Sequence, residues 1–220
     1  MFFFYLSLPT TPSKILSVVH TIYKLSGTIK HYQGIRDSSI YHYVNNHGNV
    51  PIWVLANYLN FGELRAMITS VKPNLQNAIA KDFFSFVRRH IKNPTIFTPE
   101  TMISFIENIN DVRNVCAHNN RLIGFRCRRD SKYWSSLHDI HCIGSNSPRN
   151  NVFSVFISLK CFLSVIEYGT MHNKILKELR RIGNRLSSIN VNDILRKYGF
   201  PDDWHNTVQK IDTSRFILDE

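Results

Sequence analysis

The chain has 220 residues, of which 43% are hydrophobic and 12% aromatic, so it can bury a sizeable core and is not a disordered tail. Its 27 Lys and Arg residues outnumber 16 Asp and Glu residues, which gives a formal net charge of +11. Such an excess is typical of proteins that meet a polyanion, nucleic acid above all, although it also occurs in basic proteins that are merely soluble.

Helical periodicity dominates the chain and strand alternation is scarce, which predicts an all-α helical bundle. The first predicted helix covers Ser13–Leu25, with Ser13 as its cap. A turn around Gly48 leads into a helix that begins at Pro51, where a missing N–H is not needed. Two further helices are expected, one over Asn74–Ile91 and one that starts at the Thr98 cap and runs to about Asn120.

The second half of the chain begins with a basic connection, Gly124 to Asn150, that has no clear period. It is long for a loop, so we expect it to be functional or partly mobile. Helices are then predicted over Val152–Tyr168, His172–Ser187 and Asn192–Lys197, with Gly199 ending the last of them. The run Asn151–Gly169 is the most apolar, but it contains Lys160 and therefore predicts a buried core helix rather than a membrane span.

The four cysteines have no regular spacing and are typical of reduced thiols inside a cell. A zinc site built from Cys127, His138, His141 and Cys142 can be considered, but this spacing fits no tetrahedral pattern. We therefore expect no metal and no cofactor. The opening stretch MFFFYLSLP, residues 1–9, has neither a basic start nor a small-residue cleavage site, and does not predict a signal peptide.

The stretch DVRNVCAHNNRL, residues 111–122, lies in the helix predicted from Thr98. On a wheel of about 100° per residue, one side of this helix is apolar and predicts the core-facing stripe: Met102, Phe105, Ile109, Val112 and Cys116. The opposite side predicts a polar stripe directed away from the core, formed by Asn110, Asn114, His118 and Arg121. Arg113 lies on the flank, about 140° from His118.

A solvated helix face would be the simplest interpretation of the polar stripe. Asparagine, however, is a weak helix former, and five asparagines crowd this stretch: Asn108, Asn110, Asn114, Asn119 and Asn120. We infer that something other than helicity selected at least some of them.

The segment RNVCAH has the form R-x-x-x-x-H and, within VRNVCAHNNRL, resembles the motif of the HEPN superfamily of helical nucleases as it occurs in Abi-like abortive-infection proteins of the AbiD and AbiF type. Three further segments are similar to that family in order and approximate spacing: HGNVPIWVLANYLNFGEL (47–64), LQNAIAKDF (75–83) and YGFPDDW (198–204). The resemblance covers roughly Ile35 to Val208. It predicts a shortened N-terminal helical segment over residues 1–34, an Abi-like/HEPN helical domain over 35–210 and a tail over 211–220.

The resemblance implies a metal-independent endoribonuclease that acts in phage defence through a composite site at a homodimer interface. It assigns Arg113, Asn114 and His118 as the catalytic residues. The chemistry needs a side chain that exchanges a proton near neutral pH, as histidine does, and a fixed cation for the charge that builds on the phosphate. Because Arg113 and His118 diverge on the wheel, a second copy would complete the site.

Basic residues that follow the motif are predicted to bind RNA, although a solvated loop would have the same composition: Arg121, Arg126, Arg128, Arg129 and Lys132. Tyr133 and Trp134 are expected to be available for base stacking, whereas Trp53 is expected in the core. The expected partners are RNA, a second copy of the chain and an inhibitory antitoxin or regulatory RNA. The protein is expected in the cytoplasm, without contact to a membrane.

Two other classes of protein remain open. One is a non-catalytic RNA-binding or toxin-partner module that binds RNA with steep salt dependence and leaves it intact. The other is a helical scaffold whose basic surface contacts an acidic protein.

Overall fold

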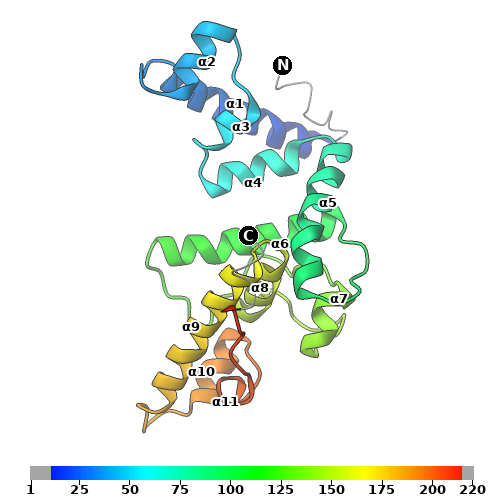
Figure 1. Cartoon of the computed structure of the whole chain (residues 1–220), viewed down its shortest axis with the longest axis vertical. Helices are drawn as coiled ribbons and strands as arrows, with labels where there is room; N and C mark the ends of the chain where they lie inside the picture. The colour runs from blue at the N-terminus through cyan, green and yellow to red at the C-terminus, as the bar shows by residue number, and fades with distance from the viewer. Residues whose placement is uncertain (1–10, 215–220) are drawn as a thin grey trace. The chain divides into compact units, whose positions relative to one another are not determined.

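The computed structural model describes residues 11–214, whose regular structure is helical, so the predicted all-α class is confirmed for this part of the chain (Figure 1). The first half contains α1 (Pro12–Tyr32), α2 (Ser39–His47), α3 (Ile52–Ala56), α4 (Phe61–Ser70), α5 (Pro73–His90) and α6 (Pro99–Ala117). The second half contains α7 (Ser135–His138), η2 (Asp139–His141), α8 (Val152–Ser158), η3 (Leu159–Cys161), α9 (Val165–Gly183), α10 (Val191–Tyr198) and α11 (Trp204–Thr207). The opening stretch 1–9 and residues 215–220 of the predicted tail lie outside the described residues.

The chain forms two compact units, one up to Ile79 and the other from Ala80. The boundary falls within α5, so the first turns of this helix belong to one unit and the later turns to the other. The domain borders predicted at residues 34 and 210 stay predictions.

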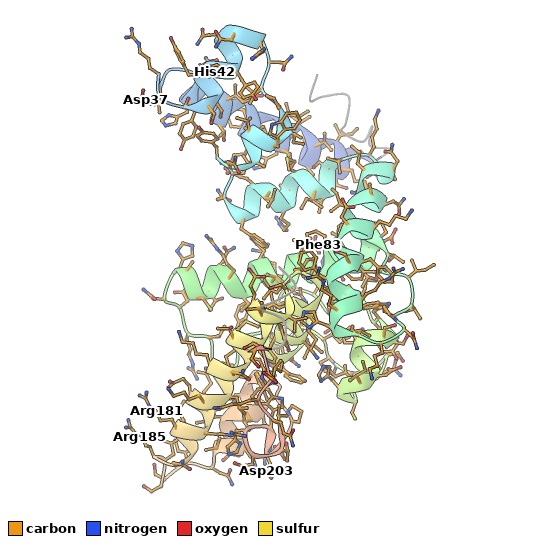
Figure 2. The ribbon with its side chains drawn as sticks, in the orientation of Figure 1. Asp37, His42, Phe83, Arg181, Arg185 and Asp203 are labelled. Carbon is orange, nitrogen blue, oxygen red and sulfur yellow. The ribbon has the colours of Figure 1, made fainter. Side chains whose placement is uncertain are left out.

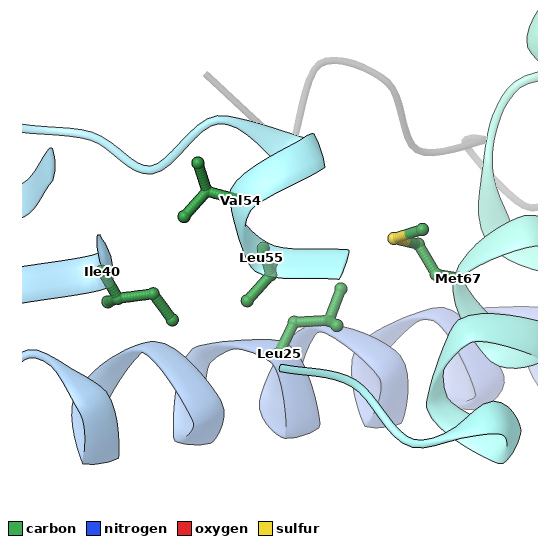
Figure 3. Close-up of a cluster of buried hydrophobic side chains, with 5 residues drawn as sticks. All are labelled: Leu25, Ile40, Val54, Leu55 and Met67. Atoms are coloured by element: carbon green, nitrogen blue, oxygen red, sulfur yellow. The ribbon is translucent and has the colours of Figure 1, made fainter. Parts of the chain in front are cut away.

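The first unit is built on the packing of α1 against α4. Thr21 on α1 and Ser70 on α4 are both buried, and their hydroxyl oxygens lie 3.3 Å apart. Polar side chains such as Asp37 and His42 are exposed at the surface of this unit (Figure 2). Its core contains one apolar side chain each from α1, α2 and α4 and two from α3, namely Leu25, Ile40, Met67, Val54 and Leu55 (Figure 3).

Three local predictions in this unit have different outcomes. Helix α1 begins at Pro12 after the N-cap Thr11, so Ser13 is not its cap as predicted, and it continues to Tyr32, which makes it longer than expected. The turn at Gly48 is confirmed, since this residue ends α2 in the left-handed region at φ 66°. The core placement of Trp53 is wrong: its side chain is 68% exposed, because Val54 and Leu55 take the buried positions of the short helix α3.

The second unit is organised around aromatic side chains. The Phe156 ring of α8 lies 5.5 Å from the ring of Tyr168 on α9, 5.6 Å from that of Phe200 and 5.8 Å from that of Trp204 (centroid distances). Every residue of α8 from Phe153 to Ser158 is buried. The segment predicted as a core helix is therefore buried over residues 153–158, and no helix of residues 11–214 is both long and apolar enough to span a bilayer.

The helix predicted over Val152–Tyr168 is interrupted. Helix α8 stops at Ser158, and α9 begins at Val165 and continues to Gly183 through the start predicted at His172. The cause is local: the Ser164 hydroxyl accepts the backbone N–H of Glu167, and the Glu167 carboxylate accepts that of Ser164, which forms a capping box. Ser164 and Glu167 have the spacing of a capping box in the sequence, but the long apolar run around them led to the prediction of one continuous helix.

Helix α10 ends at Gly199, as predicted, and this glycine connects two parts of the unit. Its φ of 84° lies in the left-handed region, and a Cβ at this position would overlap the side-chain amide of Asn151. Asn151 in turn caps α8, since its Oδ1 accepts the Ser154 N–H at 2.8 Å. Only glycine leaves room for this cap.

This close approach predicts that Gly199→Ala is more damaging than an alanine at another glycine with positive φ. Gly124 has φ 76° and no atom within 4 Å of a built Cβ, so Gly124→Ala is the matched control. We expect the control to lower the free energy of unfolding by about 1 kcal/mol. Gly199→Ala should cost a further ~1–3 kcal/mol from overpacking. Urea unfolding followed by circular dichroism measures both, and equal losses would contradict the account.

Candidate functional site

Helix α6 carries the RNVCAH motif and begins where the sequence predicts. The Thr98 hydroxyl accepts the Thr101 N–H at 3.3 Å, and Pro99 occupies the first turn. Met102 and Phe105 are fully buried, so the first half of the predicted apolar stripe does face the core.

The helix ends earlier than predicted, at Ala117, because the chain forms a Schellman motif there. The Asn119 N–H donates to the Cys116 carbonyl at 3.2 Å, and the Asn120 N–H donates to the Val115 carbonyl at 2.9 Å. Asn119 adopts the left-handed φ of 51°, which asparagine tolerates better than most residues. His118 is thereby the C-cap residue and is exposed.

The predicted polar stripe is wrong for two of its four residues. Arg121 lies beyond the helix end, and Asn110 is only 5% exposed. The apolar stripe likewise fails at Cys116, which is exposed. The Arg121 error follows from the early end of the helix; in addition, the connection 124–150 covers part of α6, as the contacts of Asn108 and Asp111 show.

Three asparagine and aspartate contacts hold this connection on α6. The Asn108 amide donates to the Arg149 carbonyl at 3.3 Å, and the Asn108 carbonyl accepts from the Cys127 thiol at 3.7 Å. The Asp111 carboxylate accepts the Arg128 N–H at 3.2 Å. Burial and the nearby Asp111 charge raise the pKa of the Cys127 thiol to about 12, so this cysteine stays protonated at neutral pH.

The connection also holds itself together, chiefly through Arg149. The Arg149 guanidinium donates to the carbonyl of Ser131 at 2.9 Å and to those of Ser145 and Ser147 at 2.7 Å. The Arg149 N–H donates to Asp130 at 2.6 Å. The long connection is therefore a folded cover on α6, and the interpretation as a mobile loop is not supported.

The aromatic residues of this cover are occupied by internal contacts. Trp134 is 6% exposed and its indole N–H donates to the Thr95 hydroxyl at 2.7 Å. Tyr133 donates its hydroxyl to Asp139 and stacks on His138 at 5.6 Å. The prediction that Trp134 is available for base stacking is wrong, and Tyr133 is already stacked.

Two histidines that follow the motif are structural. His138 is fully buried, its Nδ1 accepts the Trp134 N–H at 2.9 Å, and burial lowers its pKa to about 4. His141 lies 3.2 Å from the Lys160 amine, and burial followed by the Lys160 charge lowers its pKa to about 4 as well. Within residues 11–214, no group of three or more His, Cys, Asp or Glu side chains could hold a metal ion.

A pocket of about 210 Å³ opens beside the end of α6. It is lined by residues of the helix, its C-terminal turn and the first part of the cover: Asp111, Asn114, Val115, His118, Asn120, Phe125, Arg126 and Arg128. Two predicted catalytic residues, Asn114 and His118, thus face the same space. Arg113 is exposed and does not line it, but its guanidinium donates to the Asn114 side-chain oxygen at 3.3 Å.

Sequence analysis missed Asp111 and Phe125 as members of this site. A signal existed for Asp111, since its spacing to Asn114 and His118 is i, i+3, i+7, which places the three on one helix face. Phe125 comes from the cover, and nothing in the periodicity indicates that it returns to α6.

The predicted RNA-binding residues fall into two groups. Arg126 and Arg128 line the pocket: Arg126 donates to the Lys197 carbonyl at 3.1 Å, and Arg128 is 83% exposed with its Nε 3.7 Å from Asp111. The other three are exposed and are not among the residues that line this pocket: Arg121, Arg129 and Lys132. Their contact with RNA stays a prediction.

The residues at the end of α6 lie within a match to a known protein family. The model of the Abi-like protein family matches residues 10–124, just over half of the chain, and the match includes Arg113, Asn114 and His118. The chain belongs to the Abi-like family. Membership suggests a part in abortive-infection phage defence. The match also contains α1, and it ends at Gly124, immediately before Phe125. Searches of curated proteins and of solved structures gave no match.

The Schellman motif predicts different costs for two substitutions at one position. Asn119→Ala should lower the free energy of unfolding by about 1 kcal/mol, because a left-handed φ is less favourable for alanine than for asparagine. Asn119→Gly should cost nothing or stabilise slightly. Asn120→Ala, next in the chain and without a positive φ, is the control and should change stability by less than about 0.5 kcal/mol. A glycine variant as unstable as the alanine variant would disprove the assignment.

Burial of neutral His138 predicts a loss of stability in acid. Its pKa is about 4 when folded and near 6.5 when unfolded, so between these values only the unfolded chain binds the proton. Stability therefore falls as the pH falls from about 6.5 to 4, by about 2 kcal/mol at pH 5 for this residue. Urea unfolding at pH 7 and pH 5 should show a smaller pH effect in His138→Asn than in the control His31→Asn. An unchanged pH effect in His138→Asn would show that the loss of stability in acid does not come from His138.

Proposed function

We propose that this protein is a metal-independent endoribonuclease that cuts RNA through a site shared by two copies of the chain, in abortive-infection phage defence. The observation that carries the proposal is the pocket at the end of α6, which Asn114 and His118 both line while Arg113 bonds to Asn114. Family membership supports the biological context.

The chemistry follows from the residue types. The RNA 2′-OH attacks the neighbouring phosphorus, the bond to the 5′-oxygen breaks, and the products end in a 2′,3′-cyclic phosphate and a 5′-hydroxyl. His118 would take the proton of the 2′-OH or give one to the leaving oxygen. Its side chain is exposed, so RNA can reach it. Arg113 would stabilise the charge on the phosphate oxygens, and Asn114 would orient the phosphate.

A second copy is proposed because Arg113 is outside the set of residues that line the His118 pocket. Arg113, Cys116 and Ala117 are all exposed at this end of α6, so a second chain can approach it. In a two-fold symmetric dimer each chain would supply Arg113 to the site of its partner.

The charge of the chain supports RNA as the ligand. The net charge is +11, and exposed cations near the pocket could follow the phosphate backbone: Arg121, Arg128, Arg129 and Lys132. Such an enzyme would work in the cytoplasm and would need restraint in uninfected cells by an antitoxin or a regulatory RNA.

The site can be tested with labelled tRNA and total RNA in excess chelator. Arg113→Ala and His118→Ala should each lose at least about a hundredfold in cleavage rate. Arg185→Ala is the charge-matched control, since Arg185 is exposed just beyond α9 (Figure 2), and His20→Ala is the histidine control. Mapped product ends should be 2′,3′-cyclic phosphates.

Mixing the two inactive variants tests the shared site. In a mixed dimer, one site receives intact Arg113 from one chain and intact His118 from the other. Random pairing should therefore restore about a quarter of the wild-type activity. No recovery after mixing would exclude the shared site. Intact RNA with folded, dimeric wild-type protein would exclude catalysis by this chain and leave a non-catalytic RNA-binding or toxin-partner module.

A further inference from the structure

We propose that the pocket beside His118 binds one base of the RNA, a guanine, next to the phosphate that is cut. The choice of RNA as ligand rests on the proposed function, while the choice of base rests on the side chains of the pocket. An enzyme with such a pocket selects a guanine at a fixed position and does not cut RNA indiscriminately.

The size of the pocket admits a group of one ring system. Its volume of about 210 Å³ equals the share of roughly seven liquid water molecules, which is enough for one ring system. Phe125 and Val115 supply apolar wall, and both are partly buried. Phe125 lines the pocket and is only partly buried, so its ring offers a surface on which a base can stack.

The charged residues of the pocket favour different positions for the base and for the phosphate. Asp111 lines the pocket, and its side chain is only 12% exposed. A base that presents N–H groups can be bound by this carboxylate, whereas the pocket-lining Arg126 and Arg128 are exposed and can bind the adjacent phosphate. Arg128 is 83% exposed at the same pocket and is the better partner for the phosphate.

The hydrogen-bonding capacity of Asp111 distinguishes among the bases. One carboxylate oxygen accepts the Arg128 N–H at 3.2 Å and the other lies 3.7 Å from the Arg128 Nε, and a carboxylate offers about four acceptor sites in all. Guanine presents two adjacent donors, N1–H and the 2-amino group, on its Watson–Crick edge. Uracil presents one N–H between two carbonyl oxygens, which a carboxylate repels. Adenine and cytosine offer an amino group but no adjacent ring N–H. The pocket should therefore favour guanine most and uracil least.

The side chains of Asn114 and Asn120 add polar groups that can accept or donate at the same pocket. Asn114 is itself a proposed catalytic residue, which connects base binding to the proposed chemistry. A bound guanine would thus place the adjacent phosphate near His118 and Arg128.

The probes are 2′-O-methyl oligonucleotides, which cannot be cut because the attacking hydroxyl is blocked. One is a hexamer of uridine, and the others carry a single guanosine, adenosine or cytidine. Fluorescence anisotropy at fixed salt should show at least about tenfold tighter binding of the guanosine hexamer than of the uridine hexamer. Equal affinities for these two would overturn the proposal.

Asp111→Asn is the deciding variant, because the asparagine oxygen can still accept the Arg128 N–H while the charge and the second acceptor are lost. It should remove most of the preference for guanosine, because the guanosine hexamer loses an acceptor pair while the uridine hexamer is no longer repelled by the carboxylate. Phe125→Leu should weaken binding of the guanosine hexamer without reversing the order of the bases. A guanosine preference that survives in Asp111→Asn would overturn the assignment. These probes report binding alone. A protein that prefers guanosine but cuts no RNA would therefore contradict the proposed nuclease activity and leave the guanine pocket standing. A protein that cuts RNA without a preference for guanine would contradict the guanine pocket and leave the nuclease activity standing.

Discussion

The attachment of the basic connection to α6 is the constraint on which the candidate site depends. Asn108 and Asp111 are polar residues inside the helix, and both bind the connection rather than water. Asn108 is buried, so its amide would cost more than 1 kcal/mol if it lost its partner. This requirement brings Phe125, Arg126 and Arg128 to the end of α6, where they complete a pocket whose other wall carries Asn114 and His118.

The end of α6 adds a second constraint. The Schellman motif at Asn119 stops the helix one residue before the histidine, which leaves the His118 side chain exposed beside the pocket. The asparagines of this stretch therefore have separate causes: Asn108 binds the cover, Asn119 ends the helix and Asn114 accepts from Arg113. This asparagine-rich stretch thus contains residues that shape the backbone as well as residues proposed for chemistry.

Much of the fold could be predicted from local signals. Thr98, Gly48 and Gly199 each begin or end a helix where the sequence indicates, because caps and left-handed positions depend on neighbouring residues alone. The errors concern contacts between distant segments. Asn110 looked like a surface residue because a helical wheel does not show which distant segments cover a helix, and Trp134 looked like a free aromatic because its partner Thr95 lies 39 residues away. In the site, the motif residues and the position of His118 near a cation-rich segment were predictable, but the pocket was not, because Phe125 reaches it by a turn without periodic signal.

The central claim is that the connection is a folded cover fixed to α6, and amide hydrogen exchange measured by NMR tests it most directly. The backbone N–H groups of Cys127, Arg128, Lys132 and Arg149 donate to Asn150, Asp111, Ser104 and Asp130. The account predicts that they exchange at least about a hundredfold more slowly than in an unfolded chain. Exchange at the unfolded rate in these four residues, while the amides of α6 stay protected, would show that the connection is not held on the helix and would remove the basis of the pocket.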